Sequence, residues 1–327
     1  MKITQEFIDS NLTSLNLSTI LKTEEFTSLF TAKHLQSWGL PVCTDGDLEE
    51  LSTREHLDQV QQLAIDYSAV TDKGLSHLSC MPNLRSLSLK KVEITDSGLE
   101  HLSCLKNLEC LSLAYTPITD IGLRSLAKLP NLKRLSLEET KVSDFGMSIL
   151  TKLQALRDLC LAATKVTDIG LAEISGKLLE SLDVRCNTDS ITDKGMKHLS
   201  EINTLTRLYL SSTDVTDLGI EHLQGLPLKV LELQDTKLSD KGLEYLAKVE
   251  SLRELDLSFC DIGDAGLKFL SELKLEKLDL LNTRVTDDGL VHLSNMITLD
   301  EIRLKATGVT EVGKKRLEDL LPALKIF

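Results

Sequence analysis

Residues 99–122 read LEHLSCLKNLECLSLAYTPITDIG, and variants of this stretch follow one another along most of the chain. Its central spacing LxxLxL recurs eleven times, with Ile or Val in place of some leucines. The LxL parts lie at residues 63–65, 87–89, 111–113, 135–137, 159–161, 182–184, 208–210, 231–233, 255–257, 278–280 and 302–304. The first four steps are 24 residues long, and the later ones are 23 to 26. A period in this range is typical of a solenoid.

Each part of the general unit LxxLxLxxTxITDxGLxxLxxLxx predicts one piece of structure. The LxL alternation places two apolar side chains on the inner face of a short strand and leaves the residue between them outside. The spacing GLxxLxxL suits one face of a short α-helix or 3₁₀ segment. The Thr-Asp or Ser-Asp pair before it predicts the helix start, with a hydroxyl as the cap and a favourable carboxylate. One unit cannot bury its apolar face alone, so the units must stack.

The unit resembles the leucine-rich repeat, and its ITDxGLxxL segment is most similar to the cysteine-containing repeats of F-box leucine-rich proteins and related bacterial proteins. The resemblance implies an α/β solenoid (horseshoe) with a parallel sheet on the concave face and short helices on the convex face. Where that subclass often has Cys or Asn after the strand, this chain usually has Thr. The resemblance implies that these residues form a buried ladder to the neighbouring loop backbone, for which a hydroxyl can serve. They are Thr116, Thr140, Thr164, Thr213, Thr236, Thr283 and Thr307, with Asn187 and Cys260 as exceptions.

The two ends of the chain depart from the repeat. We expect residues 1–59 to form an N-terminal cap with two degenerate repeats, because residues 12–17 and 35–40 match LxxLxL and Thr44-Asp45-Gly46 follows the second match. A small helical cap across residues 1–56 is the alternative. Residues 60–323 form the predicted repeat array, and residues 324–327 a closing strand. Terminal repeats are expected to be atypical because they shield the core from water.

Composition limits the function and the compartment. The formal net charge of −13 argues against a nucleic-acid surface, which needs clustered Lys and Arg. No apolar run approaches the roughly 18 residues of a membrane span, and no secretory leader is visible. Seven cysteines without a CxxC motif favour a reducing compartment. We therefore expect a cytoplasmic protein or, as the resemblance suggests, one secreted into a host cell by a non-classical route.

Several polar residue types recur at one position of the repeat and resemble catalytic or metal sites, but a structural role explains them better. An Asp opens ten of the eleven predicted helical segments, with Glu311 in the last, so most of the acidic excess is assigned to this position. Histidine recurs at one helical position, where a two-histidine bridge between repeats would lack ligands. These residues are His77, His101, His198, His222 and His292. No hydrolase, zinc-protease, P-loop or dinucleotide motif occurs. We expect no catalytic residue, metal or cofactor.

The outward strand positions are therefore the predicted functional surface. The middle residues of LxL are small and neutral in the first half of the chain and mostly acidic in the second, where Arg207, Lys229, Arg253 and Lys277 were expected to interleave with the acids. Aromatics on or beside strands add interface anchors. The predicted partner-binding residues are Tyr67, Tyr115, Arg134, Asp183, Arg207, Tyr209, Glu232, Asp256, Phe259 and Asp279.

These residues predict a non-enzymatic protein-binding module. The resemblance implies that it is either a cytosolic adaptor or a bacterial effector acting in a host cell. Its partner is another protein, with a basic patch to meet the acidic column. No nucleic-acid or membrane partner is expected, and the chain is expected to be a monomer. The alternative is the substrate-recognition subunit of a ubiquitin ligase, which requires a ligase-docking element that residues 1–59 do not show.

Overall fold

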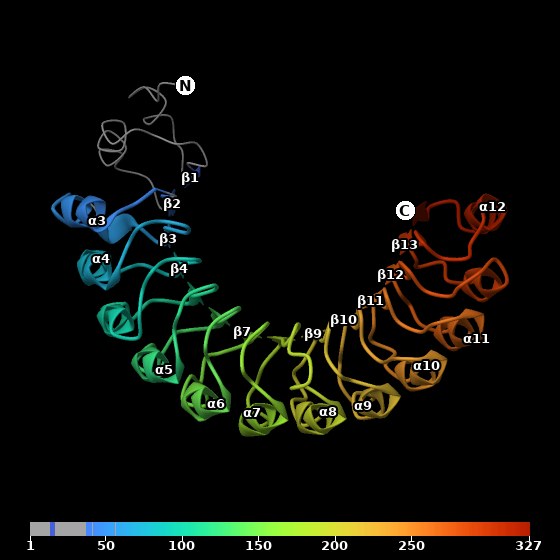
Figure 1. Cartoon of the computed structure of the whole chain (residues 1–327). Helices are drawn as coiled ribbons and strands as arrows, with labels where there is room; N and C mark the ends of the chain where they lie inside the picture. Colours follow the sequence, from blue (N-terminus) through green and yellow to red (C-terminus); the bar gives the residue numbers. More distant parts are fainter. Residues whose placement is uncertain (1–13, 17–36, 41, 56) are drawn as a thin grey trace, which may run out of the picture. The chain divides into compact units, whose positions relative to one another are not determined.

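The computed structural model describes residues 14–16, 37–40, 42–55 and 57–327, and the chain divides into two compact units, residues 1–156 and 157–327. In the first unit, the strands and helices alternate along the chain (Figure 1). Its strands are β1 (Ser14–Asn16), β2 (Ser37–Gly39), β3 (Gln62–Ala64), β4 (Ser86–Ser88), β5 (Cys110–Ser112) and β6 (Arg134–Ser136). Its α-helices and 3₁₀ segments are α3 (Asp45–Ser52), η1 (Leu57–Gln59), α4 (Asp72–Leu75), η2 (Ser76–Cys80), η3 (Gly98–Cys104), α5 (Asp120–Leu126) and α6 (Asp144–Leu150).

The second unit continues the same alternation. Its strands are β7 (Asp158–Cys160), β8 (Ser181–Asp183), β9 (Arg207–Tyr209), β10 (Val230–Glu232), β11 (Glu254–Asp256), β12 (Lys277–Asp279), β13 (Glu301–Arg303) and β14 (Lys325–Ile326). Its helical segments are α7 (Asp168–Glu173), α8 (Asp193–Leu199), α9 (Asp217–Glu221), α10 (Asp240–Leu246), α11 (Asp264–Leu267), η4 (Lys268–Leu270), η5 (Gly289–Leu293) and α12 (Glu311–Leu320).

In each unit, successive strands pair in parallel and form a sheet. The helical segments lie on the opposite side of the unit from this sheet (Figure 1). The middle leucines align across the pairs, as in Leu87↔Leu111 and Leu231↔Leu255, and their side chains are buried at 0–3% exposure. Burial of such an aligned leucine column supplies most of the favourable free energy of a solenoid. The predicted α/β leucine-rich-repeat solenoid is confirmed.

The ends of the chain add three short strands to the array. β1 and β2 occur at the two degenerate repeat motifs and pair in parallel with each other and with β3. The rest of the predicted cap, residues 1–13 and 17–36, lies outside the described residues. At the other end, β14 pairs in parallel with β13. The domain boundaries at residues 59 and 323 remain a prediction.

The helix starts follow the prediction in most repeats, but the aspartate has a second role that the sequence pattern did not reveal. Thr216 caps α9, since its hydroxyl accepts from Leu218 N at 3.2 Å. The same Thr216 donates its N–H and its hydroxyl to the carboxylate of Asp193 in the preceding repeat, at 2.8 and 2.7 Å. We call this contact the aspartate link. With Thr or Ser as the donor, it recurs within the described chain at Asp45, Asp72, Asp96, Asp120, Asp168, Asp193, Asp217, Asp264 and Asp287. Asp240 accepts only the backbone N–H of Gly263.

The aspartate link also explains the glycine of TDxG. A Cβ on Gly219 would lie 2.5 Å from Asp193 Oδ1 and 2.9 Å from Val215 Cγ1. Such approaches are closer than van der Waals contact, so the position excludes any larger side chain. The glycine is therefore required by close packing against the preceding repeat, and its φ is not positive.

The predicted threonine ladder is wrong in its direction. Thr213 Oγ1 donates to Leu210 O at 2.6 Å, three residues back in the same repeat, and the other threonines of the column do the same. At this position the threonine hydroxyl therefore bonds the backbone of its own repeat and not the backbone of the neighbouring repeat. Asn187 does reach it: Nδ2 donates to Leu161 O at 3.0 Å, and Oδ1 accepts from Thr164 N at 3.0 Å. Cys260 similarly donates to Leu233 O at 3.0 Å.

The turn after each strand has a repeated backbone conformation. Eleven equivalent non-glycine residues have φ between 51° and 59°, in the left-handed region that such residues seldom adopt. Each turn is held by the next repeat; Tyr67 N, for example, donates to Lys90 O at 2.8 Å. The residues are Tyr67, Lys91, Tyr115, Glu139, Ala163, Cys186, Ser212, Asp235, Phe259, Asn282 and Ala306.

Candidate partner-binding face

The outward side chains of β7–β14 form a surface that we call the strand face of the second unit. Because side chains alternate along a strand, the first and third residues of each strand point outward while the middle one enters the core. The third residues are Cys160, Asp183, Tyr209, Glu232, Asp256, Asp279 and Arg303. The capping and linking contacts of the repeats lie elsewhere, so these side chains are not needed to connect one repeat to the next.

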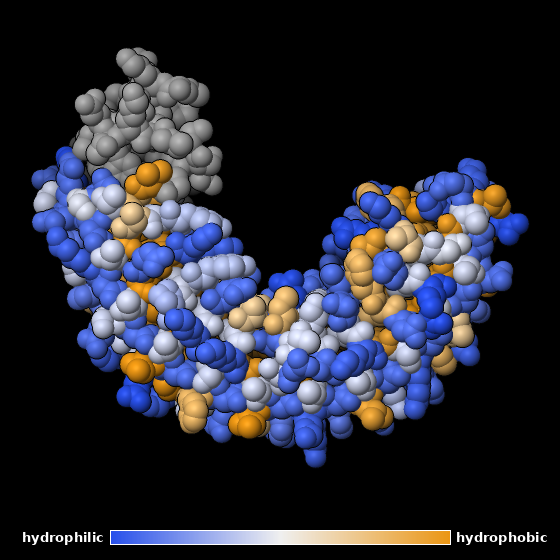
Figure 2. Space-filling view, in the orientation of Figure 1, coloured by the Kyte–Doolittle hydropathy of each residue, from blue (hydrophilic) through white to orange (hydrophobic). Residues whose placement is uncertain are grey.

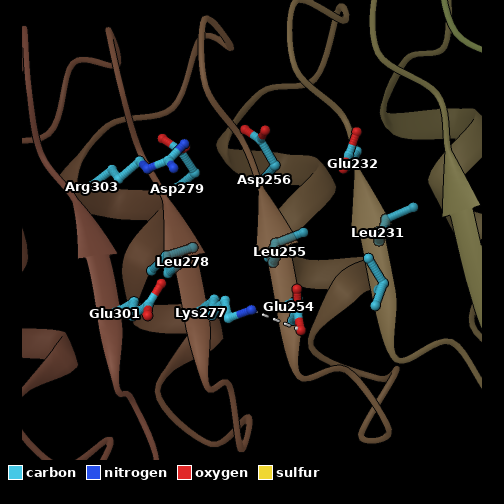
Figure 3. Close-up of a pocket in the computed structure, with 11 residues that line it drawn as sticks. Leu231, Glu232, Glu254, Leu255, Asp256, Lys277, Leu278, Asp279, Glu301 and Arg303 are labelled. Carbon is cyan, nitrogen blue, oxygen red and sulfur yellow. Dashed lines mark hydrogen bonds and ion pairs between the residues drawn. The ribbon is translucent and has the colours of Figure 1, made fainter. Parts of the chain in front are cut away.

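A hollow of about 250 Å³ lies on this face over β10–β13 (Figure 3). The side chains of Leu231, Leu255 and Leu278 are at most 2% exposed, so the strands themselves form its floor. Carboxylates outnumber cations among its lining side chains. The acids are Glu232, Glu254, Asp256, Asp279 and Glu301, and the cations are Lys277 and Arg303.

Both cations of the hollow are already bonded to acids. Arg303 Nη1 lies 3.0 Å from Asp279 Oδ2, and Lys277 Nζ lies 3.2 Å from Glu254 Oε1. Both pairs include an exposed side chain, so each adds little stability. The remaining acids leave the hollow with an excess of negative charge.

Sequence reasoning missed Arg185, which organises the acids beside the hollow. Its guanidinium lies 2.8 Å from Asp183 Oδ2, 3.3 Å from Glu232 Oε2, and 5.3 Å from the centre of the Tyr209 ring. The hydrogen bonds that Arg185 donates to Asp183 raise the pKa of Arg185 despite the opposing effect of burial. Arg185 follows β8 on the same face, two residues after Asp183, and this spacing was the signal in the sequence that could have identified it.

Glu232 is the link between this cluster and the hollow. Burial raises the pKa of Glu232, and the charges of Asp256 and Asp183 add to the rise against the opposing effect of Arg185. Burial also raises the pKa of Tyr209. The structure thus brings together three predicted residues, Asp183, Tyr209 and Glu232, around a cation that was not predicted.

The bases expected to interleave with the acidic column do so only in part. Arg207 Nη2 instead lies 3.1 Å from Asp158 Oδ1, on the first positions of β9 and β7. Arg253 donates to the backbone oxygens of Glu250 and Leu252. Most acids of the column are instead paired with Arg185 or Arg303. The backbone N–H groups of Ser258 and Leu281 also donate to two carboxylates of the column. Aligning the strands of the sequence could not predict these pairs, because long side chains reach across two strands.

The predicted residues of the first unit form a separate group. Tyr67 and Tyr115 are 60% and 42% exposed, at the left-handed turns after their strands. Lys91 lies 5.7 Å from the Tyr67 ring centre, and Lys90 lies 4.9 Å from that of Tyr115. Tyr115 donates to Glu138 Oε1 at 3.0 Å.

Two further predicted residues lie apart from these groups. Arg134 is exposed on the first position of β6, and its Nε donates to Cys110 Sγ at 3.0 Å. Phe259 is 46% exposed at the turn after β11 in the second unit.

The helix side of each unit carries separate apolar residues among hydrophilic ones (Figure 2). Several occupy the variable position of TDxG, namely Ile121, Phe145, Ile169 and Leu218, which are 58–84% exposed. The residues that the structure describes contain no group of three or more His, Cys, Asp and Glu side chains suited to a metal. Over those same residues, no helix has the length and apolar character needed to cross a membrane.

The chain matches models of leucine-rich repeats over residues 106–152, 177–200, 201–223, 227–247 and 250–271. These matches lie inside the predicted array and identify leucine-rich repeats over those residues. No curated protein matches the sequence significantly.

Solved structures of other leucine-rich-repeat proteins share the fold at low sequence identity. An internalin from Listeria monocytogenes is 23% identical, with a TM-score of 0.66 over 99% of this chain and 88% of that one. A leucine-rich-repeat protein from Leptospira interrogans is 18% identical, with a TM-score of 0.58 over 99% and 91%. A chain of the mouse RP105/MD-1 complex is 19% identical, with a TM-score of 0.58 over 89% of this chain and 50% of that one.

Proposed function

We propose that this chain is a non-enzymatic protein-binding module that holds a partner on the strand face of its second unit. The observation that carries the proposal is the hollow over β10–β13, where five acids face two cations. Surfaces with an excess of one charge favour partners of the opposite charge and speed their encounter. The partner therefore presents a basic patch.

The strand face also offers an anchor of the kind found in interfaces. Tyr209 is half-buried beside Arg185, and tyrosine and arginine are enriched among the residues that dominate binding energy. The fold supports the proposal in a general way, since one of its structural neighbours was solved as the RP105/MD-1 complex. We propose that the chain acts as a monomer, as a cytosolic adaptor or as an effector inside a host cell. None of the seven cysteines, all of which the structure describes, forms a disulfide, which suits a reducing compartment.

The test begins with crosslinking and mass spectrometry in cells that produce the protein, which identifies a partner. The double variant Tyr209→Ala, Asp256→Lys then removes an anchor and inverts one charge of the hollow. We expect its affinity for the purified partner to fall by roughly 100-fold, from about 2–3 kcal/mol lost over the two sites. Isothermal titration calorimetry measures the change.

The matched control is Leu218→Ala, Glu244→Lys, which removes an apolar side chain and inverts a charge on the helix side of the same unit. It should bind the partner like the unaltered chain. Circular dichroism and urea unfolding must show both variants folded. Equal partner affinity of the folded strand-face variant and the control would reject the strand face as the binding surface.

A further inference from the structure

Asp256 differs from its neighbours along the third strand positions. Glu232 is bonded to Arg185 at 3.3 Å, and Asp279 is bonded to Arg303 at 3.0 Å. Asp256 lies between them, and its Oδ1 accepts from the backbone N–H and the hydroxyl of Ser258 at 2.8 and 2.5 Å. Among the described residues, no cationic side chain is bonded to Asp256, and its Oδ2 has no hydrogen-bond partner. Glu232 and Asp279 thus each have a cationic partner, and Asp256 between them does not.

The same face shows how a guanidinium binds there. Arg185 stacks its guanidinium on the Tyr209 ring and reaches two carboxylates, Asp183 and Glu232. Arg303 makes a similar contact with Asp279 at the other side of Asp256. Guanidinium is planar and weakly hydrated, and it is therefore well suited to carboxylates on a partly buried surface.

The hollow has room for one more such group. Its volume is about 250 Å³, whereas one water molecule takes up about 30 Å³ of liquid. In Figure 3, Glu232, Asp256 and Asp279 stand along one rim above the strand floor, and Arg303 points toward Asp279. The strands lie about 4.8 Å apart, so a cation at Asp256 would lie within reach of both neighbouring carboxylates.

We infer that the hollow receives a single arginine side chain from an extended segment of the bound protein, with its guanidinium on Asp256 between Glu232 and Asp279. This inference names the partner chemistry of the proposed function and rests on it. Arg185 and Arg303 occupy the flanking acids and repel further cations. The site therefore takes one arginine of the partner's basic patch at Asp256.

The test uses the full chain and two fluorescent peptides that differ in one heavy atom. One peptide has arginine between Gly-Ser and Ser-Gly segments, and the other has citrulline, which keeps the shape but loses the charge. Fluorescence anisotropy at low ionic strength measures both affinities. We expect the arginine peptide to bind at least roughly ten-fold more tightly than the citrulline peptide, because charge-assisted hydrogen bonds are the stronger ones.

Three variants locate the bound arginine. Asp256→Asn keeps an oxygen for Ser258 and should weaken the arginine peptide to the level of the citrulline peptide. Arg303→Gln should strengthen binding by roughly three- to ten-fold, because it frees Asp279 without touching the core; Arg303 is 67% exposed. Glu244→Gln, on the helix side, is the matched control and should leave both affinities unchanged.

Specific outcomes overturn the inference. Equal binding of the two peptides, or of the unaltered and Asp256→Asn chains, would exclude a cation at Asp256. Weaker binding by Arg303→Gln would show that Arg303 helps rather than competes. A lysine peptide that binds more tightly than the arginine peptide would reject the guanidinium. Each of these results would leave the proposed function standing if the strand-face double variant still loses the purified partner, so the two failures are distinguishable.

Discussion

Gly219 and Gly225 lie six positions apart in the same repeat and have opposite surroundings. A Cβ on Gly219 would meet Asp193 Oδ1 at 2.5 Å, whereas a Cβ on Gly225 has no neighbouring atom within 4 Å. The sequence pattern distinguishes them only because Gly219 recurs in every unit. The pattern could predict that the recurrent glycine is structural, but not that the carboxylate of another repeat occupies the space.

We predict that Gly219→Ala destabilises the protein by about 1–3 kcal/mol, because the added methyl group displaces Asp193 or Val215. Gly225→Ala is the control and should be neutral or stabilising by a few tenths of a kcal/mol, since it restricts the unfolded chain at an open site. Urea unfolding followed by circular dichroism measures both. Equal free energies of unfolding for the two variants would contradict the close contact at Gly219.

Among single residues, the sequence indicates on which face a short side chain lies but not which partner a long side chain bonds. Asp183, Asp256 and Asp279 lie on the face that LxL alternation gives them. Arg185 and Arg207 each form an ion pair with an acid two strands away, and the spacing of residues in the sequence does not show which acid that is. Asn187 is a further example. Its amide reaches the backbone of the preceding repeat, whereas the hydroxyl of Thr213 at the equivalent position bonds within its own repeat.

At the scale of the element, many of the helical segments are fixed at their start by one hydroxyl that serves two purposes. Thr216 accepts from Leu218 N within α9 and donates to Asp193 of the preceding repeat. The short segments have little intrinsic helical stability, because one or two turns do not recover the cost of nucleation. Capping and contact with the preceding repeat therefore decide whether they form.

We predict that Thr216→Val destabilises the protein by about 1–2 kcal/mol, because valine has the shape of threonine but neither caps the helix nor donates to Asp193. Thr216→Ser keeps the hydroxyl and should retain most of the stability. Thermal unfolding of the two variants measures the difference. If the valine variant unfolds at the temperature of the serine variant, the hydroxyl has no structural role.

At the scale of the whole molecule, the aspartate links turn the acidic composition into a structural requirement. The net charge of −13 would suggest that acidification stabilises the chain by relieving repulsion. The links act in the opposite direction, because a protonated carboxyl loses acceptor capacity for the next repeat. Hydrogen bonds from Thr310 lower the pKa of Asp287. At Asp45, burial acts to raise the pKa, but hydrogen bonds from Thr71 and Gly74 outweigh it and leave the pKa lowered.

We predict that stability changes little between about pH 7 and 5 and falls steeply below about pH 4. A carboxyl whose pKa is lowered by folding contributes stability that is present above its unfolded pKa, about 4, and is lost as the pH falls through the folded value. Urea midpoints at a series of pH values measure this. A rise in midpoint on acidification below pH 4 would show that charge repulsion outweighs the links.

The fold as a whole was predictable because its decisive contacts repeat. Periodic leucines fix the strand register, the inward face and the order of the elements, and the structure agrees with all three. What the sequence could not supply is the choice of hydrogen-bond partners: the direction of the aspartate link between repeats, the bonds of the threonine column within a repeat and the contacts of Arg185. These depend on side-chain reach across a distance that the period alone does not specify.

The aspartate link has a consequence for how such a chain can be lengthened. In the links that the structure describes, each carboxylate accepts from the residue before the helix of the next unit and packs against the glycine of that unit, as Asp193 does with Thr216 and Gly219. A duplicated unit that carries its own Thr, Asp and Gly would receive a bond from the unit before it and give one to the unit after it. Tandem gene duplication would therefore reproduce every connection at both junctions, and the number of repeats can change by whole units without redesign of the sequence around them.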